Sequence, residues 1–199
     1  MGTPVSDPAL SLRTQAKADR RAALLAAAAE LFAERGYAGV SLEDLGAAAG
    51  VSGPAVYRHF AGKQAVLTQL LVGVSESLLA GGQAVVEEHP DAASALSALI
   101  EFHVRFALAD PHIIRVQDRD LDSLEPEARH QVRSLQRRYS ELWVDTVTRL
   151  RPELPRPETR LRVQATFGLI NSTPHALHGA PSAQAGVVLG SIARAALLA

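Results

Sequence analysis

Apolar residues recur along almost the whole chain at spacings of three and four positions, the period of a helix that packs on one side. Leu24, Ala28 and Leu31 follow this spacing near the N-terminus, and Val132 and Leu135 follow it further on. No stretch of useful length alternates between apolar and polar residues, as a half-buried strand would, and no internal repeat is present. The sequence therefore predicts an all-α protein.

Glycine, proline and capping residues divide the chain into about nine predicted helices. We expect them over residues 17–36, 41–50, 52–60, 64–80, 91–110, 113–117, 126–151, 158–177 and 182–198. The fourth should end at Gly81-Gly82, and Pro174 predicts a kink or an early end in the eighth. Residues 1–16 are expected to be a flexible arm, residues 17–63 a small N-terminal unit, and residues 64–199 a larger helical bundle.

Composition excludes some classes of protein and leaves others open. The chain has no cysteine, which excludes disulfides and thiolate chemistry. Its net charge is −1. Residues 1–63 hold 7 Lys and Arg against 6 Asp and Glu, and the remainder holds 13 against 15, so charge is weak evidence for or against a nucleic-acid partner. We find neither a signal-peptide pattern nor an apolar stretch suited to a bilayer, and we expect a cytoplasmic protein without membrane contact.

The most informative window runs from Ser41 to Lys63. Ser41 is placed to cap a helix, with Asp44 three residues later in a pattern close to a capping box. The turn Gly50-Val51-Ser52 separates this helix from a second, short one with Pro54 in its first turn. Two helices joined by such a turn have the spacing of a helix-turn-helix.

The second helix of this pair is predicted to turn one face toward the DNA major groove. The candidates on that face are Gly53, Pro54, Ala55, Tyr57, Arg58 and His59. Small residues at its start allow the backbone to approach bases and phosphates. Hydrogen-bond donors for the DNA backbone are added by Tyr57, Arg58, His59 and Lys63.

The stretch LFAERGYAGVSLEDLGAAAGVSGPAVYRHFAGKQAVL resembles the DNA-binding signature of the TetR family of transcriptional regulators. The matching positions are Phe32, Gly36, Tyr37, Ser41, Gly50, Val51, Ser52, Tyr57, His59, Phe60 and Lys63. A mild departure is Gly46, where a helix former with a side chain is usual, and we expect closer packing of the two helices there.

The resemblance implies a ligand-responsive regulator, expected to be a repressor that a small effector releases from a palindromic operator. It implies three DNA-binding helices followed by about six in a ligand-binding and dimerising domain. The DNA-binding set it suggests is Ser41, Ser52, Gly53, Pro54, Ala55, Tyr57, Arg58, His59 and Lys63. Arg13, Lys17, Arg20 and Arg21 are either further phosphate contacts or part of a solvated face.

Two other functions compete with this hypothesis. The window also fits a small three-helix core with a solvated face, in a partner-binding protein without DNA activity. An enzyme is disfavoured, because the chain lacks a Gly-x-Ser-x-Gly elbow, a phosphate-binding glycine loop and a convincing pair of carboxylates.

The resemblance further implies an effector cavity in the C-terminal bundle, and the sequence supplies candidates for its lining. These are Phe102, His103, Phe106, Arg115, Tyr139, Trp143, Phe167 and Asn171. The same residues also fit an ordinary core. Arg115 is suited to a carboxylate or phosphate on an anionic, partly apolar effector, or to pairing with Asp118, Asp120 or Asp122.

The last two predicted helices have more apolar surface than one bundle face hides, which predicts a homodimer interface. The candidates are Phe167, Ile170, His175, His178, Val187, Leu189 and Ile192. His175 and His178 lie three residues apart, but no third ligand accompanies them, so we expect neither a metal nor a cofactor.

Overall fold

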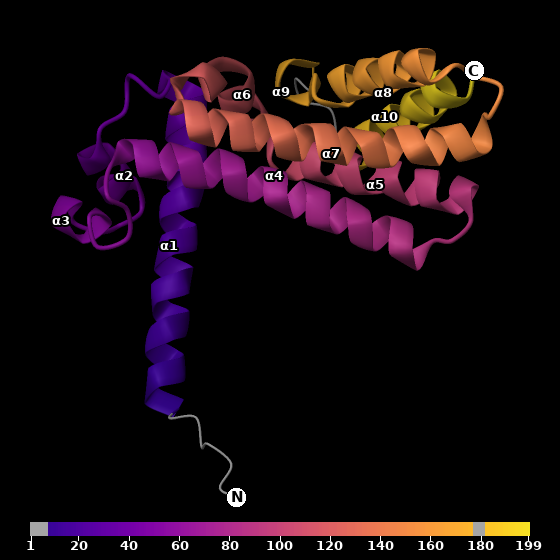
Figure 1. Cartoon of the computed structure of the whole chain (residues 1–199). Coiled ribbons are helices and arrows are strands. Elements are labelled where there is room, and N and C mark those ends of the chain that lie inside the picture. The colour runs from indigo at the N-terminus through magenta and orange to yellow at the C-terminus, as the bar shows by residue number, and fades with distance from the viewer. Residues whose placement is uncertain (1–7, 177–181) are drawn as a thin grey trace, which may run out of the picture. The chain divides into compact units, whose positions relative to one another are not determined.

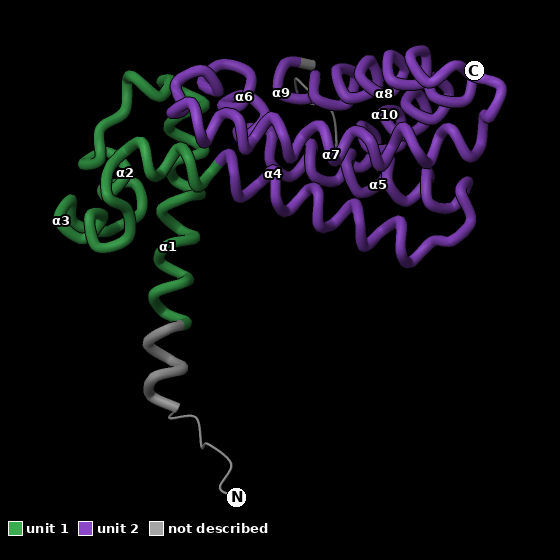
Figure 2. Tube along the Cα trace, in the orientation of Figure 1, with its two compact units in different colours: residues 1–70 green, residues 71–199 purple. Residues whose placement is uncertain are grey.

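The computed structural model describes residues 8–176 and 182–199, and their regular structure is entirely helical. Ten α-helices, α1 to α10, and one 3₁₀ turn, η1, follow one another along these residues (Figure 1). The chain divides into two compact units, one up to Leu70 and one from Leu71 onward (Figure 2). The all-α prediction is confirmed.

The first unit contains α1 (Pro8–Arg35), α2 (Leu42–Ala48), α3 (Gly53–Val56) and the first turns of α4 (Lys63–Glu88). Its core is made by apolar side chains from each of these helices and from the turns between them. Among the most deeply buried are Leu24, Phe32, Val40, Leu45, Val56, Phe60 and Leu67.

Helix α1 begins at Pro8, well before Lys17, where the sequence predicts a helix to start. Proline is tolerated in a first turn, and the alanine, leucine, glutamine and arginine residues that follow favour helix. Residues 8–16 are therefore helical, and residues 1–7 of the expected arm lie outside the described part. The helix ends as predicted, because Gly36 adopts a φ of 79° and its amide donates to the carbonyl of Phe32 at 2.9 Å.

The second unit is a bundle formed by the rest of α4 and the helices after it. These are α5 (Ala92–Ala109), α6 (Pro111–Asp120), η1 (Leu121–Ser123), α7 (Pro126–Leu150), α8 (Arg156–Ile170), α9 (Thr173–Ala176) and α10 (Ser182–Leu198). Helix α7 packs against α5 and α8, and α10 packs against the same two helices. Fully buried side chains at the centre include Leu96, Leu99, Trp143, Val163, Ile170 and Leu197.

Helix α4 does not end at Gly81-Gly82, which corrects the prediction from sequence. It continues to Glu88 because both glycines serve packing. A Cβ atom on Gly82 would lie 2.6 Å from Cε2 of Tyr139, and one on Gly81 would overlap the ring of Phe102. The two glycines therefore let aromatic rings from α5 and α7 lie directly against the α4 backbone.

The eighth predicted helix is divided in two, as Pro174 indicated. Helix α8 ends at Ile170, Asn171 and Ser172 form a turn, and α9 begins at Thr173 with Pro174 in its first turn. The division explains why ten helices are observed where about nine were expected. Thr173 is buried, and its hydroxyl donates to the carbonyl of Ala107 at 3.1 Å, which fixes α9 to the end of α5.

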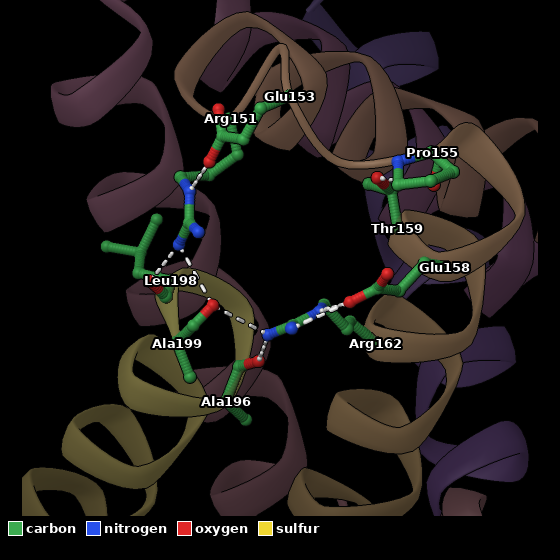
Figure 3. A network of polar contacts seen from close by, with 9 residues as sticks. All are labelled: Arg151, Glu153, Pro155, Glu158, Thr159, Arg162, Ala196, Leu198 and Ala199. Carbon is green, nitrogen blue, oxygen red and sulfur yellow. Dashed lines mark hydrogen bonds and ion pairs between the residues drawn. The ribbon is translucent and has the colours of Figure 1, made fainter.

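The last turn of α10 is held by two arginines from the α7–α8 region (Figure 3). Arg162 donates to the carbonyls of Ala196 and Ala199 at 3.2 and 3.1 Å, and Arg151 donates to the carbonyls of Leu198 and Ala199. The last carbonyls of a helix lack partners within the helix, so these contacts satisfy them. The end of α10 is thereby fixed to α8.

Two helices, α4 and α5, are long and apolar enough to cross a membrane by length and composition alone. Both contribute fully buried side chains to the protein's own cores, Leu67 and Leu71 from α4 and Leu96 and Leu99 from α5. Packing inside the protein therefore accounts for their apolar character.

Two glycines of α4 give a matched test of this packing. We expect Gly82→Ala to destabilise the chain by about 1–3 kcal/mol, because the added methyl group overlaps the buried ring of Tyr139. Gly73→Ala should instead stabilise it by about 0.5–1 kcal/mol, because a Cβ there meets no atom within 4 Å and alanine favours helix. Urea denaturation measures both. Equal effects of the two substitutions would contradict the packing role of Gly82.

Candidate nucleic-acid interface and ligand cavity

The start of α2 is fixed by a complete capping box. The Asp44 amide donates to Oγ of Ser41 at 3.1 Å, and the Ser41 amide donates to Oδ2 of Asp44 at 2.9 Å. The Ser41 hydroxyl also donates to this carboxylate at 2.7 Å, and these bonds hold the pKa of Asp44 below its ordinary value. Ser41, a predicted phosphate contact, is exposed, but its hydroxyl is already bonded within the cap.

The turn between α2 and α3 brings the two helices unusually close. A Cβ atom on Gly46 would lie 2.9 Å from the carbonyl oxygen of Val51 and 3.1 Å from Cγ2 of Val56. The Val51 amide donates to the carbonyl of Gly46 at 2.8 Å, and Gly50 adopts a φ of 67°. The closer packing expected at Gly46 is therefore observed, and it fixes α3 against α2.

Helix α3 and the residues after it present one buried and one exposed side. Val56 and Phe60 are buried in the first unit, whereas Ser52, Pro54, Tyr57 and Arg58 are exposed. Gly53 and Ala55 are half-buried. The exposed fraction of Tyr57 is 57%, which is unusual for so large a ring. Of the six predicted base-facing residues, three are thus exposed, and Gly53, Ala55 and His59 are half-buried.

Lys63, at the first position of α4, is held by contacts inside the first unit. Its Nζ donates to the carbonyl of Tyr37 at 2.8 Å and lies 4.4 Å from the centre of that ring. The Tyr37 hydroxyl in turn donates to Oε1 of Gln64 at 2.6 Å. An ammonium group has three hydrogens, so Lys63 keeps donors for a phosphate while fixing the start of α4.

Arg21, considered above as a phosphate contact, has an internal role. From α1 its Nη1 donates to the carbonyl of His59 at 2.6 Å, its Nη2 donates to the side chain of Gln69, and its guanidinium lies 4.5 Å from the Phe60 ring centre. It therefore joins the segment after α3 to α4. This role leaves no local signal along the chain, because the partners lie 38 and 48 residues away.

His59 is half-buried, and its Nδ1 is enclosed without a hydrogen-bond partner in the described residues. Burial, and then the nearby positive charges led by Lys17, lower the pKa of His59 below its ordinary value. A neutral ring is a weaker phosphate contact than a cationic one, so a contribution of His59 to DNA binding would rest on the Nε2 side of the ring.

The second unit encloses a cavity of about 220 Å³. Five of the predicted effector residues line it: His103, Phe106, Tyr139, Phe167 and Asn171. Seven further lining residues were not predicted, namely Ser75, Leu78, Ile114, Gln117, Gln136, Arg137 and Gln164. They belong to α4, α6, α7 and α8, and only the packing of these helices brings them together.

The other three predicted effector residues lie elsewhere. Trp143 is fully buried beside the cavity, with its ring centre 5.0 Å from that of Phe167. Phe102 packs on Gly81. Arg115 donates to the carbonyl of Pro174 at 2.8 Å and lines a separate cavity of about 270 Å³ between the ends of α5, α6 and α9 and the start of α10. The structure therefore does not place Arg115 on the cavity that the aromatic residues line.

A buried chain of hydrogen bonds forms one wall of the 220 Å³ cavity. His103 Nε2 lies 3.2 Å from Oδ1 of Asn171, and its Nδ1 lies 3.3 Å from the Tyr139 hydroxyl. An amide oxygen only accepts, so Nε2 is assigned the hydrogen and Nδ1 accepts from Tyr139. Burial lowers the pKa of His103 to about 4 and raises that of Tyr139, so both groups are neutral near pH 7.

The predicted dimer residues separate into exposed and internal groups. Val187 and Ile192 of α10 are 75% and 45% exposed, whereas Ile170 is fully buried and Phe167 lines the cavity. Leu189 packs partly against the core, His175 is exposed, and His178 lies outside the described residues. Two further exposed apolar residues, Leu161 of α8 and Val188 of α10, were not predicted.

The fold and these sites define a helix-turn-helix unit joined to a helical bundle with an internal cavity. The family described as "Bacterial regulatory proteins, tetR family" matches residues 24–70, and that described as "Tetracyclin repressor-like, C-terminal domain" matches residues 89–175. The chain belongs to the TetR family of bacterial regulators, which confirms the resemblance drawn from the sequence.

Several known proteins are similar to this chain. The HTH-type transcriptional repressor KstR2 of Rhodococcus jostii is 29% identical over 66% of this chain and 65% of its own length. The HTH-type transcriptional activator FasR of Mycolicibacterium smegmatis is 28% identical over 66% and 60%. The chain thus matches less than two thirds of the length of each. The structure of AibR, solved with isovaleryl coenzyme A and operator DNA, superposes with a TM-score of 0.72 at 16% identity, over 87% of this chain and 97% of AibR.

The buried His103 predicts a specific dependence of stability on pH. Its pKa is about 4 in the folded chain against an ordinary 6.5, so the unfolded chain takes up a proton that the folded chain does not. The contribution of His103 to the free energy of unfolding should therefore be constant above pH 6.5. It should fall as the pH drops from 6.5 toward about 4, by up to about 1.4 kcal/mol per pH unit.

Urea denaturation at about pH 7 and about pH 5 measures this dependence while most carboxylates stay ionised. Between these two pH values the parent chain should lose more stability than the His103→Gln variant, which has no titratable side chain at this position. Equal losses in the two chains would show that His103 is not the origin of the pH dependence.

Proposed function

We propose that this TetR-family chain is a transcriptional regulator that binds operator DNA as a homodimer through α2 and α3. The observation that carries the proposal is the open side of α3, where Tyr57 and Arg58 project from a scaffold fixed by Gly46 and the Ser41–Asp44 cap. A helix held in this way is rigid enough to enter a major groove, and its exposed donors can contact phosphates and base edges.

Affinity in this proposal comes from a few contacts per subunit and not from bulk charge. Residues 1–63 carry a net charge of only +1, and Arg21 and Lys63 make internal contacts. Ser52, Tyr57 and Arg58 are therefore the main donors from the helix-turn-helix, with Gly53, Pro54 and Ala55 allowing close approach. Two copies on one operator double this small set of contacts, so the operator should be roughly palindromic.

The dimer interface in this proposal is the outer face of α8 and α10. Leu161, Val188 and Ile192 are 69%, 48% and 45% exposed, a concentration of large apolar side chains that a monomer would leave in water. Gly168 of α8 has no atom within 4 Å of the position of a Cβ atom, so a partner helix can approach its backbone there. Pairing α8 and α10 across a two-fold axis buries this surface.

The 220 Å³ cavity supplies the site for a small effector. It is lined by α4, α5, α6, α7 and α8, and α4 is the helix whose first residue, Lys63, contacts Tyr37 in the first unit. An effector against Ser75 or Leu78 would therefore act on the helix that leads into the DNA-binding unit. An anionic, partly apolar effector is our hypothesis, and the complex of AibR with isovaleryl coenzyme A is consistent with it.

We propose repression as the sign of regulation and the cytoplasm as the location. KstR2 is described as a repressor and FasR as an activator, so a reporter gene behind the chain's operator decides the sign. An enzymatic role has less support, because these relatives are transcription regulators.

DNA binding can be tested by gel shift with the DNA upstream of the chain's own gene. We expect the parent to bind, and Tyr57→Ala and Arg58→Ala each to weaken binding by about tenfold, because each removes an exposed contact duplicated in the dimer. Arg35→Ala, an exposed arginine of α1 paired with Glu34, is the control and should bind as the parent does. Unchanged binding by both α3 variants would refute this interface.

The dimer can be tested by light scattering after gel filtration. Leu161→Asp and Ile192→Asp should each shift the protein toward monomer, because each buries a carboxylate in an apolar interface. Tyr57→Asp introduces the same charge at an equally exposed apolar position in the first unit and should leave the dimer intact. A monomeric parent would refute the dimer. A dimer that neither bundle substitution affects would mean that the interface lies elsewhere.

A further inference from the structure

Arg137 lies where the internal cavity meets a groove on the outside of the second unit. It lines the 220 Å³ cavity and also a groove of about 370 Å³ between α4 and α7. The groove is formed by Leu79, Gln83, Ser134, Arg137, Arg138, Glu141, Leu142 and Asp145. Arg137 is the residue that both linings share, so an anionic group beside it is within reach of the cavity and of the groove.

The arginines of α7 differ in what they contact. Arg129 and Arg133 both pair with Asp122, at 3.5 and 3.4 Å, and Arg149 donates to the carbonyl of Pro90 at 2.6 Å. Arg137 and Arg138 are exposed, and their side chains make no hydrogen bond or ion pair with any other described residue. The two unpaired cations are therefore neighbours in sequence, and both line the groove.

The acidic groups of the same groove do not compensate these two charges. Glu141 lies 2.7 Å from Arg156 and 2.9 Å from Arg160, and Asp145 lies 2.7 Å from Arg156. The hydrogen bonds from Arg160 and Arg156 hold the pKa of Glu141 below its ordinary value. The groove beside Arg137 thus has positive charge available for a ligand.

The rest of the cavity has the opposite character, because its lining apart from Arg137 is uncharged. Arg137 is the one ionised side chain among the twelve described residues that line it, since His103 is neutral near pH 7. Phe106, Phe167 and Leu78 offer apolar surface. An anionic group placed among them would be desolvated without a partner, whereas one at Arg137 would be paired and in contact with water.

We propose that the cavity and the groove form one site for an amphiphilic anion, with its apolar body in the cavity and its anionic group at Arg137 and Arg138. The proposal rests on the proposed function only in taking this ligand as the effector. The proposal assigns the anion to arginines of α7, whereas the sequence pointed to Arg115, which lies in α6. A carboxylate and a phosphate ester meet the same chemistry, and the two arginines repel a cationic group placed beside them.

The single tryptophan of the chain provides a signal from inside the cavity. Trp143 is fully buried, with its ring centre 5.0 Å from Phe167 and 5.9 Å from His103, both of which line the cavity. A ligand on the outer surface does not touch this ring, because none of it is exposed. Its fluorescence therefore reports occupation of the cavity.

The experiment compares two probes that differ in charge and hardly in shape, 3-phenylpropionate and 3-phenylpropanamide, titrated into the full chain near neutral pH. The parent should bind the carboxylate about fivefold more tightly than the amide, as expected for a partly exposed ion pair. Arg137→Ala should abolish this preference and leave the affinity for the amide within about twofold of the parent. Arg133→Ala, one turn earlier and paired with Asp122, is the matched control and should keep the preference.

Several results would overturn the proposal. They are equal affinity for both probes in the parent, a preference that survives Arg137→Ala and Arg138→Ala, an equal loss in Arg133→Ala, and no change in Trp143 fluorescence with either probe. Gel shift on the same samples separates this site from the proposed function. A chain that shows the carboxylate preference and binds no DNA keeps the site and refutes the regulator.

Discussion

The hydrogen bonds of His103 to Asn171 and Tyr139 join three segments of the second unit through one buried side chain. They join α5, α7 and the turn after α8 along one wall of the 220 Å³ cavity. The turn at Asn171 is where α8 ends, so the same residue that breaks the helix accepts the bond. Because His103 is neutral, these contacts place polar but uncharged groups in the cavity wall. We therefore expect an anionic group at Arg137, where the cavity meets the groove.

Local signals in the sequence were enough to predict the helix-turn-helix. Gly36 and Gly50 adopt positive φ angles where turns were expected, and Ser41 caps α2 with Asp44. Such features depend on a few neighbouring residues, and the side-chain pattern states them directly. The departure at Gly46 was also informative, because the loss of a side chain there matches a close approach of α3.

Contacts between distant segments were beyond the reach of the same reasoning. Gly81 and Gly82 look like a helix end, but they make room for rings from α5 and α7, 21 and 57 residues further along the chain. Arg115 was a reasonable candidate for an anion until Pro174 was seen to accept its hydrogen bond, and Arg137 carried no signal beyond its charge. Which arginine faces a cavity depends on how the helices pack, and periodicity fixes only the face of one helix.

The central claim is that two helix-turn-helix units act together on a symmetric operator. Footprinting of the DNA around the chain's own gene, with the full chain, tests it most directly. We expect a protected region made of two inverted half-sites whose centres lie about 34–36 Å apart, or a multiple of that distance. Protection without such symmetry, or no protection at concentrations where the chain is dimeric, would contradict it.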